Sequence, residues 1–115
     1  MSLTTSSGIN CYDKRGKPMT DYAAIEKLLS DEKYRRVGGT HLKNGLWVST
    51  VWLGLDHSFT GGKPVIFETM VFDTKDISEG VSGKELYQCR YQTLSQARAG
   101  HKRAVKSFQN YKRIK

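Results

Sequence analysis

The sequence predicts one α+β domain, in which an antiparallel sheet of about four strands packs against an N-terminal helix and a long C-terminal helix. Three observations support this prediction. The chain has 115 residues, which is the usual length of one domain. The middle of the chain holds several segments with the pattern of strands, and helical apolar periodicity occurs only toward its two ends. The expected order is strand, helix, four strands and helix.

The N-terminal part of the chain, residues 1–41, has weak signals for secondary structure. We expect residues 1–8 to be disordered and residues 9–115 to form the domain. Residues 9–12 are predicted to form a short strand, and residues 13–18 have the composition of a turn. A helix over residues 21–31, capped by Thr20, follows. Residues 33–41 are predicted to be a weaker strand, interrupted by two glycines.

The central strands have stronger signals. Asn44-Gly45 is a typical hairpin turn, and residues 46–55 and 64–72 carry large apolar side chains on both faces. We therefore expect these two strands to be central and covered on both sides. Residues 73–84 are polar and glycine-containing, so we expect a mobile loop. Residues 85–92 alternate in the manner of a further strand.

The beginning of the C-terminal helix is marked by a capping signal in the sequence. Thr93 and Gln96 have the spacing of a capping box. At 100° per residue, the residues expected to face the sheet share one arc of about 80°; they are Ala97, His101, Ala104, Phe108 and Tyr111. His101 lies within this arc and has no second histidine or cysteine nearby on the helix. We therefore expect a buried, hydrogen-bonded histidine rather than a metal ligand.

Composition excludes several classes of protein. No apolar run approaches the roughly 18 residues of a membrane span, and residues 1–10 do not resemble a secretory signal. The two cysteines, Cys11 and Cys89, are too few for a disulfide scaffold or a four-cysteine zinc site. These features indicate a cytoplasmic protein with free thiols, no membrane association and no cofactor.

Positive charge is concentrated at one end of the chain. The 19 basic and 11 acidic residues give a net charge of +8. Seven basic residues and no acidic one occur after residue 93, whereas residues 1–93 carry a net charge of only +1. This asymmetry predicts a polyanionic or acidic partner; the alternative is a solvated face that only confers solubility. The candidate binding residues are Arg98, Lys102, Arg103, Lys106, Lys112 and Arg113, which Lys14, Arg15, Lys17, Arg35 and Arg36 extend if their loops lie nearby.

A second candidate site lies between the two central strands. Asp56 and His57 precede Glu68, a carboxylate in the middle of a strand, and these three groups suit acid–base chemistry or a divalent metal. In the simpler interpretation, Asp56 organises a turn and Glu68 pairs with an arginine such as Arg90. We assign neither catalytic residues nor a metal site and keep this set as the alternative. The residues around Gly61-Gly62-Lys63 lack the pattern of a phosphate-binding loop.

Four segments resemble a family of small, mostly uncharacterised phage and prophage proteins. They are residues 47–59 (WVSTVWLGLDHSF), 66–72 (IFETMVF), 90–93 (RYQT) and 99–101 (AGH). In that family the last helix and the loop after Phe72 are often more acidic than here. The resemblance implies a viral origin, and phage proteins of this size often block a host component, including CRISPR complexes and other defence systems.

Together these observations favour a non-enzymatic phage accessory protein of the host cytoplasm. Its expected partner is nucleic acid, a host nucleoprotein or an acidic host protein, and the chain itself is a candidate homodimer. The alternatives are a small enzyme or a nucleotide- or metal-binding protein that uses Asp56, His57 and Glu68, and a minor structural protein of the virion.

Overall fold

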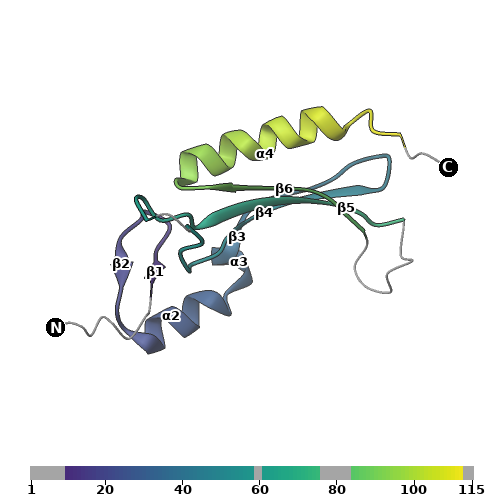
Figure 1. Cartoon of the computed structure of the whole chain (residues 1–115). Coiled ribbons are helices and arrows are strands. Elements are labelled where there is room, and N and C mark those ends of the chain that lie inside the picture. The colour runs from purple at the N-terminus through teal and green to yellow at the C-terminus, as the bar shows by residue number, and fades with distance from the viewer. Residues whose placement is uncertain (1–9, 59–60, 76–83, 113–115) are drawn as a thin grey trace.

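A computed structural model describes residues 10–58, 61–75 and 84–112 of the chain. Four strands form an antiparallel sheet: β3 (Arg36–His41), β4 (Leu46–Trp52), β5 (Phe67–Asp73) and β6 (Lys84–Tyr91), in that spatial order. The long helix α4 (Leu94–Phe108) lies along one face of this sheet, as Figure 1 shows. The predicted α+β class is confirmed, and β4 and β5 are the central strands. The expectations for residues 1–8, for most of the loop over 73–84 and for Arg113 lie outside the described residues.

The N-terminal part is more elaborate than predicted. β1 (Cys11–Tyr12) pairs with a second short strand, β2 (Pro18–Met19), which the sequence pattern does not reveal. The next helix, α2 (Tyr22–Leu29), is capped by Asp21, whose Oδ1 accepts the N–H of Ala23 at 3.0 Å. The prediction that Thr20 caps this helix is therefore wrong.

A one-turn helix, α3 (Glu32–Arg35), occupies the beginning of the segment predicted as a strand. The Asp31 carboxylate accepts the N–H of Tyr34 at 3.1 Å and so caps a helical turn that competes with the extended conformation. The strand begins only at Arg36. The expectation of a strand from residue 33 is corrected accordingly.

Small residues set the distance between α4 and the sheet. Ala97, Gly100 and Ala104 are buried against it. Ala97 belongs to one and Ala104 to the other of two groups of core residues that lie toward opposite ends of the strands. One group surrounds Trp52 and Phe67, and the other contains Leu46, Val48 and Val71. A methyl group at position 100 would lie 2.1 Å from Oη of Tyr91, so the helix backbone and β6 are as close as a glycine permits.

Both ends of α4 are fixed by side chains. At the first turn, Thr93 and Gln96 form the predicted capping box. At the last turn, the Asn44 side-chain amide donates to the carbonyl oxygen of Phe108 at 2.9 Å. Asn44 and Gly45 belong to the turn between β3 and β4, as predicted, and Gly45 has a φ of 87°. The direction of α4 across the sheet is thus set by residues far apart in the sequence.

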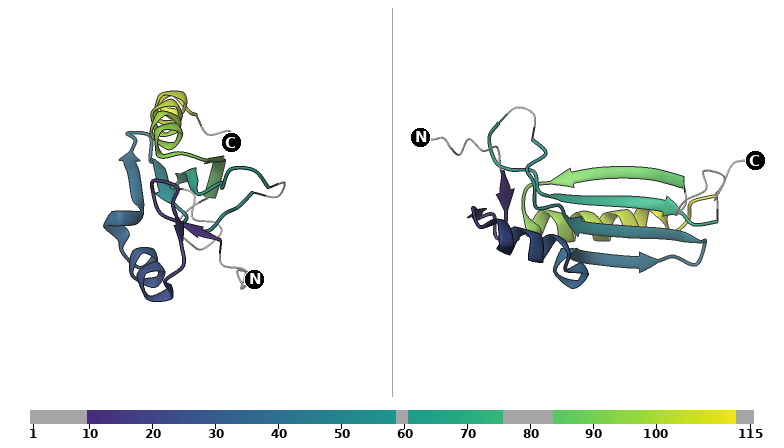
Figure 2. Two further views of the ribbon diagram at one scale, coloured as in Figure 1. Left: turned by 90° about the vertical axis from the view of Figure 1, so that its left-hand side faces the viewer. Right: turned by 90° about the horizontal axis from the view of Figure 1, so that it is seen from below.

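The opposite face of the sheet is more open. In the right-hand view of Figure 2 the four strands lie in front of α4, and α2 lies beside them rather than across them. Burial along β4 alternates: Val48 and Thr50 are buried beneath α4, whereas Trp47, Ser49 and Val51 on the other face are half-buried. The expectation that both faces of the central strands are covered is therefore met only in part: the face beneath α4 is buried, whereas most described residues on the other face are half-buried. None of the helices described is both long and apolar enough to cross a membrane.

Candidate functional site

The predicted basic residues of α4 point away from the sheet. Because Ala97, Gly100 and Ala104 are buried, one side of α4 faces the sheet, and the basic residues lie at other positions around the helix. All the candidates that the structure describes are exposed: Arg98, Lys102, Arg103, Lys106 and, just beyond the helix, Lys112. Arg98, Lys102 and Lys106 follow one another at four-residue intervals and share an arc of about 80° on the helix. Arg103 lies on the side that faces β6, where its charge acts on the Tyr87 hydroxyl.

The charge of this row is not neutralised within the part of the chain that the structure describes. Helix α4 contains no acidic residue. The ion pairs found among the described residues join Arg36 to Glu32 and Arg90 to Glu68, and neither includes a residue of α4. The positive field at α4 therefore acts outward on whatever approaches.

Lys14 extends the positive charge beyond the helix. The loop after β1 is held near α3 because the backbone N–H of Lys14 donates to the Tyr34 hydroxyl at 2.9 Å, and the Lys14 ammonium lies 4.8 Å from the centre of the Tyr34 ring. Burial lowers the pKa of Lys14, and the nearby charge of Arg98 lowers it further, although Asp31 acts in the opposite direction. The charges of Lys14 and Arg98 thus act on one another, and Lys14 lies with Leu94 and Ser95 around the same cavity at the beginning of α4. From the sequence alone, this extension was expected only if the loop lay near the helix. We call Lys14, Arg98, Lys102, Arg103 and Lys106 the basic surface.

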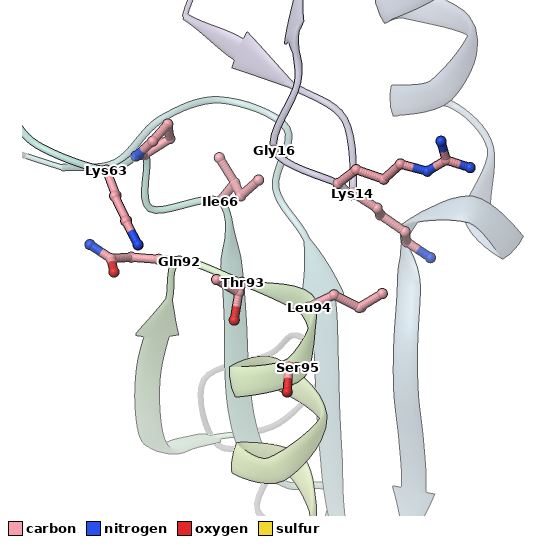
Figure 3. Close-up of a pocket in the computed structure, with 10 residues that line it drawn as sticks. Lys14, Gly16, Lys63, Ile66, Gln92, Thr93, Leu94 and Ser95 are labelled. Carbon is pink, nitrogen blue, oxygen red and sulfur yellow. The ribbon is translucent and has the colours of Figure 1, made fainter.

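A cavity of about 470 Å³ adjoins the beginning of α4. Ile66 and Leu94 give it apolar walls, and Lys14, Arg15 and Lys63 contribute positive charge. In Figure 3 the side chains of Lys63 and Gln92 point toward one another on one side, whereas Lys14 extends on the other. The cations border this cavity from separate sides and do not converge on one point within it.

In the described residues, the polar groups of the alternative site have structural partners and do not form a metal-binding group. Asp56 Oδ1 accepts the backbone N–H groups of Ser58 and Val65, both at 2.8 Å, so this carboxylate organises the loop. The backbone N–H of His57 donates to the carbonyl of Val65 at 2.9 Å. Within the described ranges there is no group of three or more His, Cys, Asp or Glu side chains placed to hold a metal ion.

Glu68 instead belongs to a cross-strand pair. Its register partner on β6 is Arg90, whose Nε donates to Glu68 Oε2 at 3.0 Å, and the Gln88 amide donates to the same oxygen. The Glu68 side chain is 10% exposed and that of Arg90 is 36% exposed. The predicted ion pair is confirmed, and it satisfies a carboxylate that the sheet largely buries.

His101 of α4 is hydrogen-bonded, as predicted, but it is half-buried rather than fully buried. His101 Nε2 lies 2.9 Å from Thr40 Oγ1 and Nδ1 lies 2.7 Å from Thr50 Oγ1, and the Thr50 hydroxyl in turn contacts that of Thr69 at 2.5 Å. Burial lowers the pKa of His101. Sequence reasoning missed the three threonines, although their inward positions follow from the alternation along each strand.

Comparisons with protein-family models, curated proteins and solved structures find no match to this chain. Many residues that carry the resemblance to phage proteins have structural roles here: Thr50, Glu68, Arg90, Tyr91, Gly100 and His101 join α4 or neighbouring strands to one another. The viral origin stays a prediction.

Proposed function

We propose that this protein binds nucleic acid through its basic surface and does so without catalysis. The observation that carries the proposal is the row of Arg98, Lys102 and Lys106, which is exposed, lies on a helix fixed to the sheet and has no ion-pair partner among the described residues. Neutralisation of phosphates by such side chains releases counterions and favours binding.

The dimensions of the row suit a phosphate backbone. Four residues of helix correspond to about 6 Å, so the three side chains cover about 12 Å. One strand of duplex DNA presents a phosphate every 3.4 Å or so along the axis, and the row therefore reaches about three or four of them. Lys14 and Arg103 add contacts at its borders. Contacts of this kind position a nucleic acid without reading its bases, so we expect little sequence preference.

The proposed setting follows from the sequence. If the chain comes from a phage, as its resemblance implies, the partner is nucleic acid or a nucleoprotein of the host cytoplasm, and an acidic host protein is the competing partner. Both described cysteines are free thiols, which suits that compartment.

Charge reversal tests the proposal. Binding of a fluorescently labelled 20-base-pair DNA duplex is followed by anisotropy at several salt concentrations. With four or five phosphate contacts, we expect log K to fall by about 4 for each tenfold rise in salt. The triple variant Arg98→Glu, Lys102→Glu, Lys106→Glu should lose binding and retain the circular dichroism of the wild type, because these residues are exposed.

A matched variant separates local from overall charge. Lys27, Lys33 and Lys75 are exposed and lie outside the basic surface, and their triple replacement by Glu changes the net charge by the same amount. We expect this control to keep most of the affinity. Equal losses in the two variants, or a wild type without salt-sensitive binding to DNA or RNA, would overturn the proposal.

A further inference from the structure

The open face of the sheet presents one tryptophan in a fixed orientation. A methyl group at Gly39 would lie 2.6 Å from Cη2 of Trp47, so the indole rests against the backbone of β3. The His41 ring stacks on the indole with 4.1 Å between ring centres and 30° between planes. Trp47 is only half-buried, so these contacts hold an aromatic surface that still reaches solvent.

A small cavity of about 220 Å³ adjoins this indole, between α3 and the open face of β4. It is lined by Trp47, Ser49 and Val51 of β4 and by Glu32, Arg35 and Arg36. The Arg36 guanidinium lies 6.0 Å from the centre of the indole and pairs with the exposed Glu32 at 3.2 Å. The volume is below the roughly 300–1,000 Å³ of cavities that enclose a drug-sized molecule, and it suits a single planar ring.

Positive charge connects this cavity to the basic surface. Arg35 and Arg36 directly follow Tyr34, whose ring contacts the Lys14 ammonium, and Lys14 lies with Leu94 and Ser95 around the cavity at the beginning of α4. Cations therefore continue from α4, around the beginning of β3, to the open face. An aromatic ring beside guanidinium groups is the combination that binds a base together with its phosphate.

From these contacts we propose that a base of single-stranded nucleic acid stacks on the part of the Trp47 indole that His41 leaves exposed, while Arg35 and Arg36 contact its phosphates. This inference rests on the proposed function and adds to it a preference for single-stranded over double-stranded nucleic acid. A base within a duplex is already stacked and paired, so it cannot reach the indole without leaving the helix. The protein accordingly binds a single strand through both faces and a duplex through the basic surface alone.

The two tryptophans of the chain allow a direct test on the wild-type protein. Trp52 is fully buried and its indole N–H donates to the Tyr12 carbonyl at 2.8 Å, so its resonance serves as an internal reference. In a sample with ¹⁵N-labelled tryptophan, adding a 12-nucleotide oligothymidylate should shift the Trp47 indole resonance more than that of Trp52. A duplex of the same length should leave both resonances nearly unchanged.

The variant Trp47→Leu provides the second measurement. By anisotropy it should bind the oligothymidylate at least about fivefold more weakly than the wild type, whereas its affinity for the duplex should be unchanged. Tyr22→Leu, which removes a 65% exposed aromatic ring on α2 outside the cavity, should have no effect on either probe.

The outcomes distinguish the two proposals. A Trp47 resonance that does not move while salt-sensitive binding persists would overturn the stacking inference and leave the basic surface standing. An equal loss of duplex and single-strand binding in Trp47→Leu would overturn it as well. Absence of binding to both probes would overturn the inference together with the proposed function.

Discussion

Replacing Gly100 with alanine should destabilise this protein, although glycine-to-alanine changes inside exposed helices usually stabilise by about 1 kcal/mol. The added Cβ would lie 2.1, 2.3 and 2.5 Å from Oη, Cζ and Cε1 of Tyr91. Ordinary contact begins near 3.4 Å, so α4 or the ring must move by more than an ångström. Tyr91 is only 7% exposed and cannot rotate into solvent.

The expected magnitude follows from two opposing contributions. Overpacking of this kind costs about 1–3 kcal/mol, and three close contacts argue for the upper end of that range. After the gain in helix propensity, a net loss of about 2 kcal/mol remains. In a domain of this size, it corresponds to a decrease in Tm of roughly 8 °C.

Thermal and urea unfolding, followed by circular dichroism, measure this loss. The control Ala99→Gly changes the neighbouring exposed position and should cost about 1 kcal/mol through helix propensity alone. In the background of Tyr91→Leu, which removes the aromatic ring and all three contacting atoms, Gly100→Ala should no longer destabilise. A single variant Gly100→Ala more stable than the wild type would refute the close packing of α4 on β6.

Two further predictions concern charged and titratable groups. Glu68→Gln should lower the free energy of unfolding by about 1 kcal/mol; the cost is modest because Arg90 is partly exposed and solvent screens the pair. The control is Glu26→Gln, at an exposed position of α2. An unchanged urea midpoint in Glu68→Gln would contradict the prediction. Burial lowers the pKa of His101 below its ordinary value of about 6.5, so the unfolded chain binds this proton more readily than the folded protein. The stability contributed by neutral His101 is therefore present above pH 6.5 and is lost as the pH falls further. As the pH is lowered from 7 to 5, the urea midpoint should decline less in His101→Gln than in the wild type. An equal decline of the midpoint with pH in the two proteins would contradict this.

The elements that the sequence predicts well are those specified by local patterns. Thr93 and Gln96 mark the beginning of α4 with a reciprocal cap, and the apolar arc of the helix identifies the residues that face outward. The exposure of Arg98 and Lys102 was therefore predictable. The pair of Glu68 and Arg90 was predictable as well, because each charged residue stands in a strand and needs a partner.

The elements that the sequence misses depend on contacts between distant segments. The strand β2 has only two residues, which are too few to show a strand pattern. Helix α3 forms because Asp31 caps its turn, but the residues that follow have the pattern of a strand, so the sequence does not indicate a helix there. The proximity of Lys14 to Arg98 arises from the packing of a loop on Tyr34, which no spacing encodes. The orientation of Trp47 likewise depends on a glycine of the neighbouring strand.

The bond from Asn44 to the last turn of α4 has a thermodynamic consequence for recognition. It joins residues 64 positions apart and, together with the cap at Thr93, holds the helix at both ends before any partner arrives. A basic segment that is unstructured when free loses conformational entropy when it folds on its target, and this loss weakens its affinity. Here the backbone that carries Arg98, Lys102 and Lys106 is already preorganised, so association restricts little beyond the side chains themselves.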